Sequence, residues 1–345
     1  MKILLIGSFL YPMYAPAFET GFKELGHDVK VIKYEDFQYG GGVMGSLLLR
    51  LQSRFHIGYK LLAYNRKIIE EAEDFRPDFI FLYRCYNIWS KTVRHLKEKG
   101  NIIFTYNNDD PFSGTPNLGY YRNFKSILPH ADVNFIYRKK NIADYENVGA
   151  RNMRLLLPYY IGRNNYFIEC EKDIPLAFLG HFENDGRDLF ILKLKEAGLP
   201  VVVYGDEKWK DAPLYDKIKD IVYPAKRGEA YNETINHCRI CLVFFSKLNH
   251  DTYTRRCFEI PAAKGVMLCE YTDDMNELFP EGKCAVYFRN VQELVEKAYF
   301  LLEHPDEVVR ISENAYNRLK ELGGSEFDRC QEIIDDYNKI KSELK

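Results

Sequence analysis

The chain has 345 residues, enough for two domains of ordinary size. It carries 48 Lys and Arg against 50 Asp and Glu, a formal net charge of −2, and this balance argues against a general nucleic-acid-binding protein. No apolar run reaches the length of a membrane-spanning helix, so we expect no transmembrane segment, while peripheral contact with a membrane stays open. Several of the eight cysteines lie inside apolar strand patterns, which indicates buried free thiols and a reducing, cytoplasmic location.

Strand patterns alternate with helix patterns through the first half of the chain. We expect strands at residues 2–7, 28–34, 79–83, 101–106, 133–137 and 153–157, helices at 15–25, 47–75, 90–99, 118–128 and 139–147, and a glycine turn at 40–42. Residues 2–7 are assigned to the first strand rather than to a signal peptide, because their removal would take one strand from an otherwise complete sheet. The alternation predicts a doubly wound parallel sheet in a domain of residues 1–158.

The alternation of strand and helix patterns begins again in the second half, after an irregular stretch at residues 159–172 that we interpret as an interdomain linker. Strands are expected at residues 176–179, 201–204, 221–223, 240–245, 266–269 and 285–288, and helices at 186–197, 229–237, 255–264, 291–303, 305–322 and 326–345. The second domain would span residues 173–325, with residues 326–345 as a separate final helix. The predicted fold class is therefore α/β, with two Rossmann-like, doubly wound parallel-sheet domains.

The richest chemistry lies between residues 250 and 270, where a charged loop and a short helix follow a buried strand. In parallel sheets ligands bind outside the carboxyl ends of the strands, and this place holds Asp251, Arg255, Arg256 and Glu259. Arginine forks bind phosphate oxygens, and a carboxylate accepts hydrogen bonds from the two hydroxyls of a ribose. Phosphate and ribose recognised together indicate a nucleotide. The alternative is a solvated arginine face, with Glu259 complementing the helix dipole.

Three segments of this half form a compound pattern: R-C-F-E-I-P-A-A-K-G at residues 256–265, T-D-D-M-N-E-L-F-P-E-G-K at 272–283, and V-Q-E-L-V-E-K-A-Y-F-L-L-E-H-P-D-E at 291–307. The pattern resembles glycosyltransferases of the GT-B fold, and most closely the CgeB-like, or spore-maturation-type, group. The resemblance implies two domains facing a cleft, the acceptor on the amino-terminal side and a nucleotide sugar on the carboxyl-terminal side. It also implies that the final helix crosses back to the first domain.

Two carboxylates in this region match a spacing found in many GT-B enzymes, Glu, seven residues, Glu. Asp251 and Glu259 have that spacing, with Asp replacing the first Glu. The resemblance implies that Glu259 binds the donor ribose and that Asp251 faces the donor sugar.

Glycines open the loop after the first strand of each half, at Gly7 and at Gly180, and glycine lets backbone amides approach a ligand. In GT-B relatives the second of these loops contacts the donor phosphates and a basic residue follows it, which implies roles for Gly180 and Arg187. Gly205 ends the next strand and is expected to line the base or ribose pocket. His181 and His250 lie in loops on the same side and are expected to form hydrogen bonds rather than to catalyse.

The sequence N-N-D-D-P-F follows the strand expected at residues 101–106 and supplies two adjacent carboxylates, Asp109 and Asp110. One of them is a candidate base for the acceptor hydroxyl; turn formation before Pro111 is the alternative. We prefer Asp110, because a residue before proline is pushed towards an extended conformation that would carry its side chain out of the turn. Tyr11 and Arg84 are further candidates for this side, and no metal or cofactor is expected.

The sequence therefore predicts a cytoplasmic glycosyltransferase. It would move a sugar from a nucleotide-diphosphate sugar to the hydroxyl of a saccharide, lipid-linked or protein acceptor in bacterial surface glycan or glycoconjugate synthesis. Two alternatives stay open, a nucleotide-sugar epimerase of the same fold and a non-catalytic nucleotide- or sugar-binding protein. The donor base, the sugar, the acceptor and the stereochemistry are not indicated by any motif.

Overall fold

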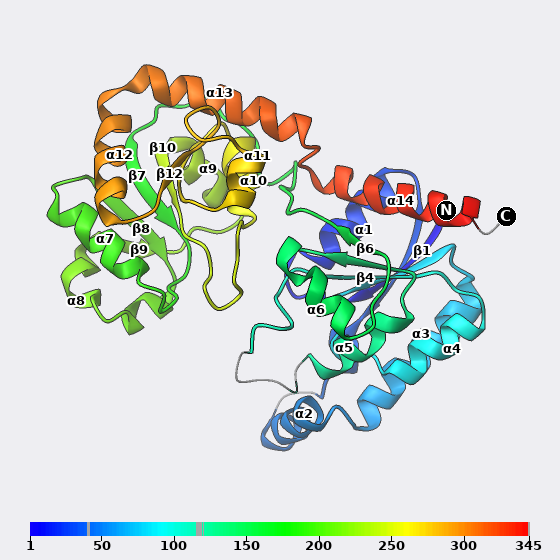
Figure 1. Cartoon of the computed structure of the whole chain (residues 1–345). Helices are drawn as coiled ribbons and strands as arrows, with labels where there is room; N and C mark the ends of the chain where they lie inside the picture. The colour runs from blue at the N-terminus through cyan, green and yellow to red at the C-terminus, as the bar shows by residue number, and fades with distance from the viewer. Residues whose placement is uncertain (40–41, 115–118, 120, 344–345) are drawn as a thin grey trace. The chain divides into compact units, whose positions relative to one another are not determined.

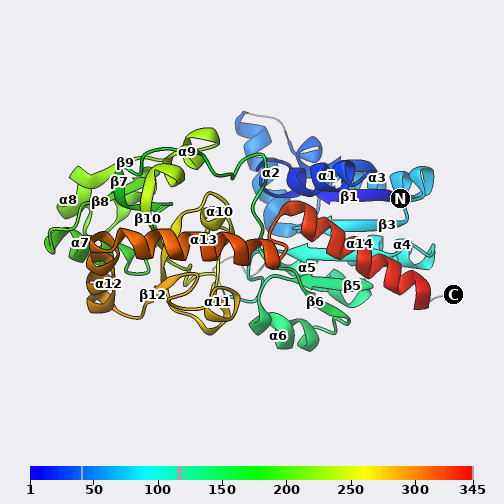
Figure 2. The same ribbon diagram turned by 90° about the horizontal axis from the view of Figure 1, so that it is seen from above.

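The computed structural model describes residues 1–39, 42–114, 119 and 121–343. The chain divides into two units, one made of Met1–Leu157 with Glu326–Lys345 and the other of Pro158–Ser325, here called unit 1 and unit 2. Each unit contains one sheet with helices on both of its faces (Figures 1 and 2). Parts of three expected elements, the glycine turn at 40–42, the helix at 118–128 and the end of the final helix, lie outside the described residues.

The sheet of unit 1 has six parallel strands in the order β2-β1-β3-β4-β5-β6. They are β1 (Lys2–Gly7), β2 (Asp28–Lys33), β3 (Phe79–Tyr83), β4 (Ile103–Asn107), β5 (Val133–Ile136) and β6 (Met153–Leu155). The residues of β3 and β4 are buried throughout because helices cover both faces of the sheet, and this explains their continuous apolar sequences. The chain reverses its direction of travel across the sheet between β1 and β3, which places a topological switch point there.

The helices of unit 1 are α1 (Ala15–Glu24), α2 (Val43–Phe55), α3 (Tyr59–Phe75), α4 (Ser90–Glu98), α5 (Arg122–Ile127), α6 (Ile142–Asn147) and α14 (Glu326–Glu343). The single helical region expected at residues 47–75 is therefore two helices. His56 ends α2 in the left-handed conformation, with φ 52°, and Gly58 has φ 144°, which is open only to glycine without strain. The break turns α3 onto the sheet and leaves α2 at the edge of unit 1 (Figure 1).

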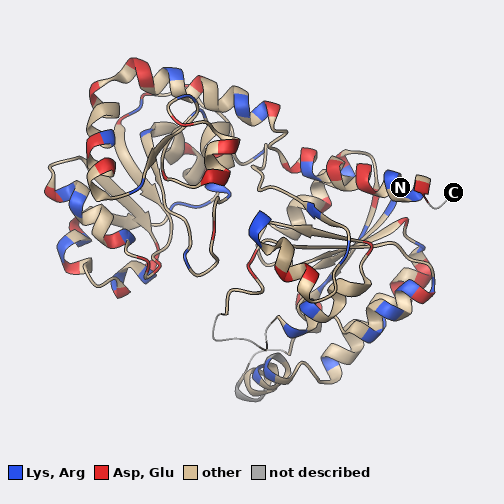
Figure 3. Ribbon diagram, in the orientation of Figure 1, with Lys and Arg blue, Asp and Glu red and all other residues tan. Residues whose placement is uncertain are grey.

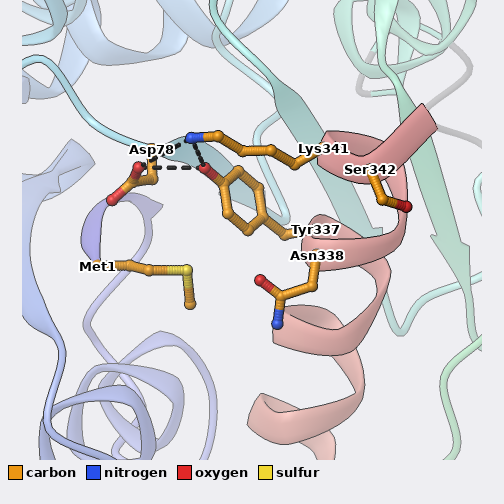
Figure 4. Close-up of a pocket in the computed structure, with 6 residues that line it drawn as sticks. All are labelled: Met1, Asp78, Tyr337, Asn338, Lys341 and Ser342. Carbon is orange, nitrogen blue, oxygen red and sulfur yellow. Dashed lines mark hydrogen bonds and ion pairs between the residues drawn. The ribbon is translucent and has the colours of Figure 1, made fainter. Parts of the chain in front are cut away.

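The last helix, α14, packs against α1 and closes the edge of the unit 1 sheet where β1 and β3 begin. Tyr337 donates to Oδ1 of Asp78 across 3.1 Å, and the backbone amide of Lys2 donates to Oδ2 across 2.8 Å. Lys341 lies 3.6 Å from the same carboxylate (Figure 4). These contacts line a small hollow at the amino ends of the strands, the edge of the sheet opposite to that expected for a ligand.

The sheet of unit 2 also has six parallel strands, in the order β12-β11-β10-β7-β8-β9, with its switch point between β7 and β10. They are β7 (Ile174–Leu179), β8 (Val201–Gly205), β9 (Val222–Pro224), β10 (Cys238–Val243), β11 (Val266–Glu270) and β12 (Val286–Phe288). The helices are α7 (Arg187–Glu196), α8 (Tyr215–Ile218), α9 (Glu229–His237), α10 (Arg256–Ala262), α11 (Asp273–Leu278), α12 (Val291–Glu303) and α13 (Pro305–Glu321). The prediction of two doubly wound parallel sheets is confirmed.

Two features of unit 2 differ from the expectation. The expected linker at residues 159–172 packs as part of this unit, because the side chain of Asn232 bonds both the amide and the carbonyl of Tyr166. Helices α8 and α11 were not predicted, although the first turn of α11 carries a sequence signal: the Thr272 hydroxyl accepts from the amide of Met275, and Asp273 and Asp274 follow the cap.

Basic and acidic residues are both spread over the two units, in agreement with the near-zero net charge (Figure 3). All eight cysteines are free thiols, and seven are buried. Within the described ranges, every helix is too short or too polar to span a lipid bilayer.

Candidate functional site

The switch point of unit 2 brings Gly180, at the end of β7, against Arg256, the first residue of α10. A Cβ atom on Gly180 would lie 2.6 Å from Nη2 of Arg256 and 3.0 Å from its Cζ, so a larger residue would require this guanidinium to move. Arg256 also lies over the ring of Phe178, 5.4 Å from its centroid. Gly180 and Arg256, which the sequence indicated separately, are thus adjacent: a backbone without a side chain lies beside a guanidinium.

Glu259, one turn further along α10, is held by two donors. Its Oε1 accepts from Nη2 of Arg255 across 2.7 Å, and its Oε2 accepts from the hydroxyl of Tyr231 across 2.8 Å. Burial raises the pKa of the Tyr231 phenol well above its ordinary value, and the Glu259 charge adds to this rise, so the hydroxyl keeps its proton. A carboxylate offers about four acceptor positions, so the two donors orient Glu259 and leave it capacity to accept from a diol.

Gly205 lies under an indole ring. A Cβ atom there would come within 2.0 Å of Cδ1 of Trp209, and Nε1 of Trp209 donates to the carbonyl of Gly180 across 2.8 Å. The glycine is therefore required by packing, and Trp209 fixes the loop that follows β7. Contact between Gly205 and a nucleotide stays a prediction. No motif in the sequence connected Trp209 or Tyr231 with the site.

Arg187 has a different environment from the one expected of a phosphate ligand. It is 3% exposed, its Nε and Nη2 donate to the two carboxylate oxygens of Asp185 across 2.8 and 2.6 Å, and its Nη1 donates to the carbonyl of His181 across 2.8 Å. Its charge is already paired inside its own loop, and contact between Arg187 and a phosphate stays a prediction. Arg187 is paired because two carboxylates of the same loop lie beside its guanidinium: Asp185 at 2.6 Å and Glu183 at 3.6 Å.

The imidazole of His181 is exposed, and its Nε2 lies 2.9 Å from Oε1 of Glu183. Burial would raise the pKa of Glu183, but hydrogen bonds from His181 and Ser246 and the charge of Arg187 outweigh it and lower the pKa to about 2. His250 and Asp251 lie in the loop after β10, on the same side of the sheet. His250 is exposed with φ 48°, and the amide of Asp251 donates to the carbonyl of Ser246 across 2.8 Å. Their roles stay predictions.

Unit 1 has a cavity of about 280 Å³ at its own switch point. Its walls come from the loops after β1, β2 and β3 together with α2 and α3, and it includes three of the residues expected on the acceptor side, Gly7, Tyr11 and Arg84. Four further tyrosines line it: Tyr14, Tyr34, Tyr64 and Tyr86. Glu35 ties this wall together, since it accepts from the hydroxyl of Ser8 and from the amide of Phe9. We call this cavity the tyrosine pocket.

Arg84 is the charged centre of the tyrosine pocket. Its backbone is left-handed, with φ 51°, and its guanidinium lies 4.6 Å from the centroid of the Tyr14 ring. Its Nη2 donates to Oδ2 of Asp109 across 2.5 Å, and its Nε donates to the hydroxyl of Tyr86 across 3.0 Å. The same hydroxyl lies 3.0 Å from Oδ2 of Asp109. Asp109 is thereby connected to the pocket through two of its lining residues.

The arrangement of the two adjacent carboxylates is the reverse of the one expected. Asp110 is 1% exposed, and its Oδ1 accepts from the amide of Phe112 across 2.9 Å and from Asn141 across 3.0 Å. Lys140 lies 3.4 Å from its other oxygen. The expectation that Asp110 leaves the turn was therefore wrong: its side chain folds back onto the turn after Pro111, and Asp109 is the partly exposed carboxylate.

Among the described residues, no group of three His, Cys, Asp or Glu side chains is placed to hold a metal ion. Cys238 and Cys241, which have the C-x-x-C spacing of some metal sites, are both buried free thiols in β10.

Residues 187–322 match a protein-family model described as glycosyl transferase-like, and this segment of unit 2 contains Arg256 and Glu259. The whole chain is similar in fold to sucrose-phosphate synthase from Thermosynechococcus elongatus, with a TM-score of 0.71, 11% identity and 99% of each chain covered. It is also similar to a glycosyltransferase from Rickettsia africae ESF-5, with a TM-score of 0.70, 13% identity and 98% of each chain covered. For Anabaena Alr3699/HepE, solved in complex with UDP and glucose, the TM-score is 0.67 at 12% identity, with 98% of this chain and 100% of that chain covered. No curated protein sequence is significantly similar to the chain.

These likenesses extend over the full length of the chain and identify its fold as GT-B, as the sequence predicted. At 11–13% identity they establish the fold and leave the reaction to be argued from the residues.

Proposed function

We propose that the chain is a glycosyltransferase that moves a sugar from a nucleotide-diphosphate sugar to an acceptor hydroxyl. The observation that carries the proposal is the close approach of Gly180 and Arg256 at the switch point of unit 2, with Glu259 one turn further along α10. An open backbone beside a guanidinium suits a diphosphate, and an oriented carboxylate one turn away suits a ribose diol. The glycosyl transferase-like match over residues 187–322 supports the same conclusion.

The chemistry assigned to these residues is charge stabilisation of the leaving group. The acceptor oxygen forms a bond to the anomeric carbon, the bond from that carbon to the diphosphate breaks, and the nucleotide diphosphate leaves with the electron pair. Arg256 would stabilise the negative charge that develops on the diphosphate. The acceptor proton passes to a base, and Asp109, beside the tyrosine pocket of unit 1, is our candidate.

UDP is the first nucleotide to test, because Anabaena Alr3699/HepE has been solved with UDP and with UDP-glucose. Thermal unfolding in the presence of UDP, GDP, ADP and dTDP identifies the donor class, since a ligand at 100 times its Kd stabilises the folded protein by about 2.7 kcal/mol. We expect Arg256→Gln to abolish the shift and Arg310→Gln, on the exposed face of α13, to preserve it. A chain that none of the four nucleotides stabilises would contradict the proposal.

Incubation of the chain with the matching nucleotide sugar separates transfer from the two alternatives. A transferase releases nucleotide diphosphate faster when a saccharide acceptor is present. An epimerase changes the nucleotide sugar without an acceptor, and a binding protein changes nothing. We expect transfer to continue in the presence of EDTA; loss of turnover that magnesium or manganese restores would show that a metal takes part. Membership of the CgeB-like group and a role in bacterial surface glycan synthesis stay predictions.

A further inference from the structure

An apolar surface covers α2 and the start of α3 in unit 1. Seven large apolar side chains between residues 47 and 62 are from 37% to 76% exposed: Leu47, Leu48, Leu51, Phe55, Ile57, Tyr59 and Leu62. We call this the α2–α3 surface. Side chains of this kind are usually buried, and a contiguous exposed group of them marks a place where a protein binds a partner or a membrane.

The position of α2 explains which of its faces is outward. Gln52 is 1% exposed and its Nε2 donates to the hydroxyl of Tyr34 across 3.3 Å, so this side of α2 packs against the rest of unit 1. Leu48, Leu51 and Phe55 follow the spacing i, i+3, i+7 and form one stripe along the helix. Arg50 and Arg54 are exposed and border this stripe at the spacing i, i+4. An apolar stripe bordered by arginines is the pattern of a helix that lies in the plane of a lipid interface.

The charge of the segment has one sign. Between residues 38 and 69 the chain contains no Asp or Glu, while it contains Arg50, Arg54, Lys60, Arg66 and Lys67. Lys67 pairs with Glu71 of the same helix across 2.7 Å. This sequence gives the α2–α3 surface a local excess of positive charge. It is complementary to an anionic lipid surface and not to a second copy of itself, whose arginines would face like charges.

A shallow apolar hollow of about 650 Å³ lies beside α2, lined by Ile57, Gly58, Tyr59, Leu62, Trp89 and Lys91. The ammonium of Lys91 lies 4.5 Å from the ring centroid of Trp89, and the indole nitrogen of Trp89 donates to the carbonyl of His56 across 3.0 Å. Aromatic and basic side chains together are characteristic of the boundary between lipid head groups and acyl chains.

We propose that the α2–α3 surface docks the chain onto a membrane that contains anionic lipids. The apolar stripe of α2 would enter the head-group region, with Arg50 and Arg54 on lipid phosphates. Leu49 of the same helix lines the tyrosine pocket, so a docked chain would present this pocket next to the lipid head groups. The proposal depends on this surface alone and is independent of the reaction proposed above, because membrane binding is measured without turnover.

The test is co-sedimentation of the full chain with vesicles of phosphatidylcholine alone and of phosphatidylcholine mixed with phosphatidylglycerol. We expect binding to the anionic vesicles that weakens as salt rises. Leu51→Asp combined with Phe55→Asp should weaken it at least about tenfold, because each change puts a charge in the apolar stripe. Val309→Asp, at a valine of α13 that is 62% exposed, is the matched control and should bind like the parent chain.

A second variant tests the contribution of charge to membrane binding separately from that of the apolar side chains. It also tests the proposal if the first variant fails to fold. Arg50→Gln with Arg54→Gln keeps the apolar stripe and should weaken binding to anionic vesicles by roughly 10- to 30-fold. The proposal is overturned if the parent chain does not bind anionic vesicles, or if either folded double variant binds them as the parent does. A third outcome also overturns it: the parent chain is a dimer that does not bind vesicles, and Leu51→Asp with Phe55→Asp makes it a monomer. The surface would then join two copies of the chain.

Discussion

The guanidinium of Arg84 donates to the carboxylate of Asp109 across 2.5 Å, although 25 residues separate the two in the chain. Arg84 holds a left-handed backbone to do so, a conformation that costs a non-glycine residue about 1–3 kcal/mol and is found at functional sites. The pair connects the end of β4 with the tyrosine pocket after β3. It ties Asp109 to the wall of this pocket, and for this reason we propose Asp109 as the base.

Asp109→Asn is expected to lower turnover by about 10²–10⁴, because an amide cannot take the proton of the acceptor hydroxyl. Binding of the nucleotide should stay unchanged, since the residues assigned to it lie in unit 2. Turnover and nucleotide affinity of the purified variant check this, with thermal unfolding as the control for the lost ion pair with Arg84. Turnover close to that of the parent chain would remove Asp109 from the mechanism.

Asp110→Asn is expected to reduce stability rather than chemistry. The buried carboxylate accepts from Phe112 and Asn141 at Oδ1, and an asparagine that keeps both bonds would put its amide nitrogen, a donor, at the Oδ2 position that faces the ammonium of Lys140. A loss of about 1–3 kcal/mol in the free energy of unfolding follows from a buried group left without its partner. Urea unfolding measures it. Parent-like stability with a large loss of turnover would return the catalytic role to Asp110.

Glu259→Ala is expected to weaken binding of the nucleotide diphosphate by about 1.5–3 kcal/mol, the contribution of hydrogen bonds to a charged group. Tyr231→Phe removes only one of the two donors that orient this carboxylate and should cost about 0.5–1.5 kcal/mol. Titration calorimetry on both variants tests the order of the two effects. Equal and unchanged affinities in folded variants would contradict the ribose assignment.

Gly180→Ala and Arg256→Gln are expected to act as one unit. The added Cβ would meet the guanidinium of Arg256, so the alanine variant should displace the arginine and lose much of the same nucleotide affinity. The double variant should then lose clearly less than the sum of the single losses, by about 0.5–3 kcal/mol. A double-variant cycle in nucleotide affinity measures this coupling, and additive losses would contradict it by showing that the two residues act independently.

The pKa of Glu183, lowered to about 2 in the folded chain from an ordinary value of 4.5, predicts an acid-sensitive contribution to stability. Because the folded pKa is the lower one, this stability is fully present above about pH 4.5 and is lost as the pH falls towards 2. The parent chain should therefore be more stable than Glu183→Gln at neutral pH, and the difference should shrink below pH 4.5. Urea unfolding at several pH values checks this; a difference that grows as the pH falls would contradict it.

The architecture was readable from the sequence because it depends on local patterns. The buried runs at β1 and β3 are apolar at every position, and the helices between the strands carry their own periodicity, so two parallel sheets could be predicted without any long-range contact. The same holds for the charged loop that follows β10, since parallel topology by itself places Arg256 and Glu259 at the carboxyl edge of the sheet.

The break between α2 and α3 was not readable in this way. Residues 47–75 are helical in pattern almost throughout, and the left-handed His56 is decided by contacts that the turn makes elsewhere: the His56 carbonyl accepts from the indole of Trp89, 33 residues away. The apolar surface of α2 became visible only with this break, because a sequence pattern does not say whether an apolar stripe faces the core or the solvent.

The assignment of side chains within the site was decided by tertiary structure alone. Asp109 and Asp110 are identical in chemistry and adjacent in sequence; the first meets Arg84 and Tyr86, and the second meets Asn141, 31 residues away. Likewise Arg187 is neutralised by Asp185, whereas Arg256 lies against Gly180. Hydrogen-bond partners that arrive from distant strands determine which charge is buried and which is presented to a ligand, and no local pattern of the chain encodes them.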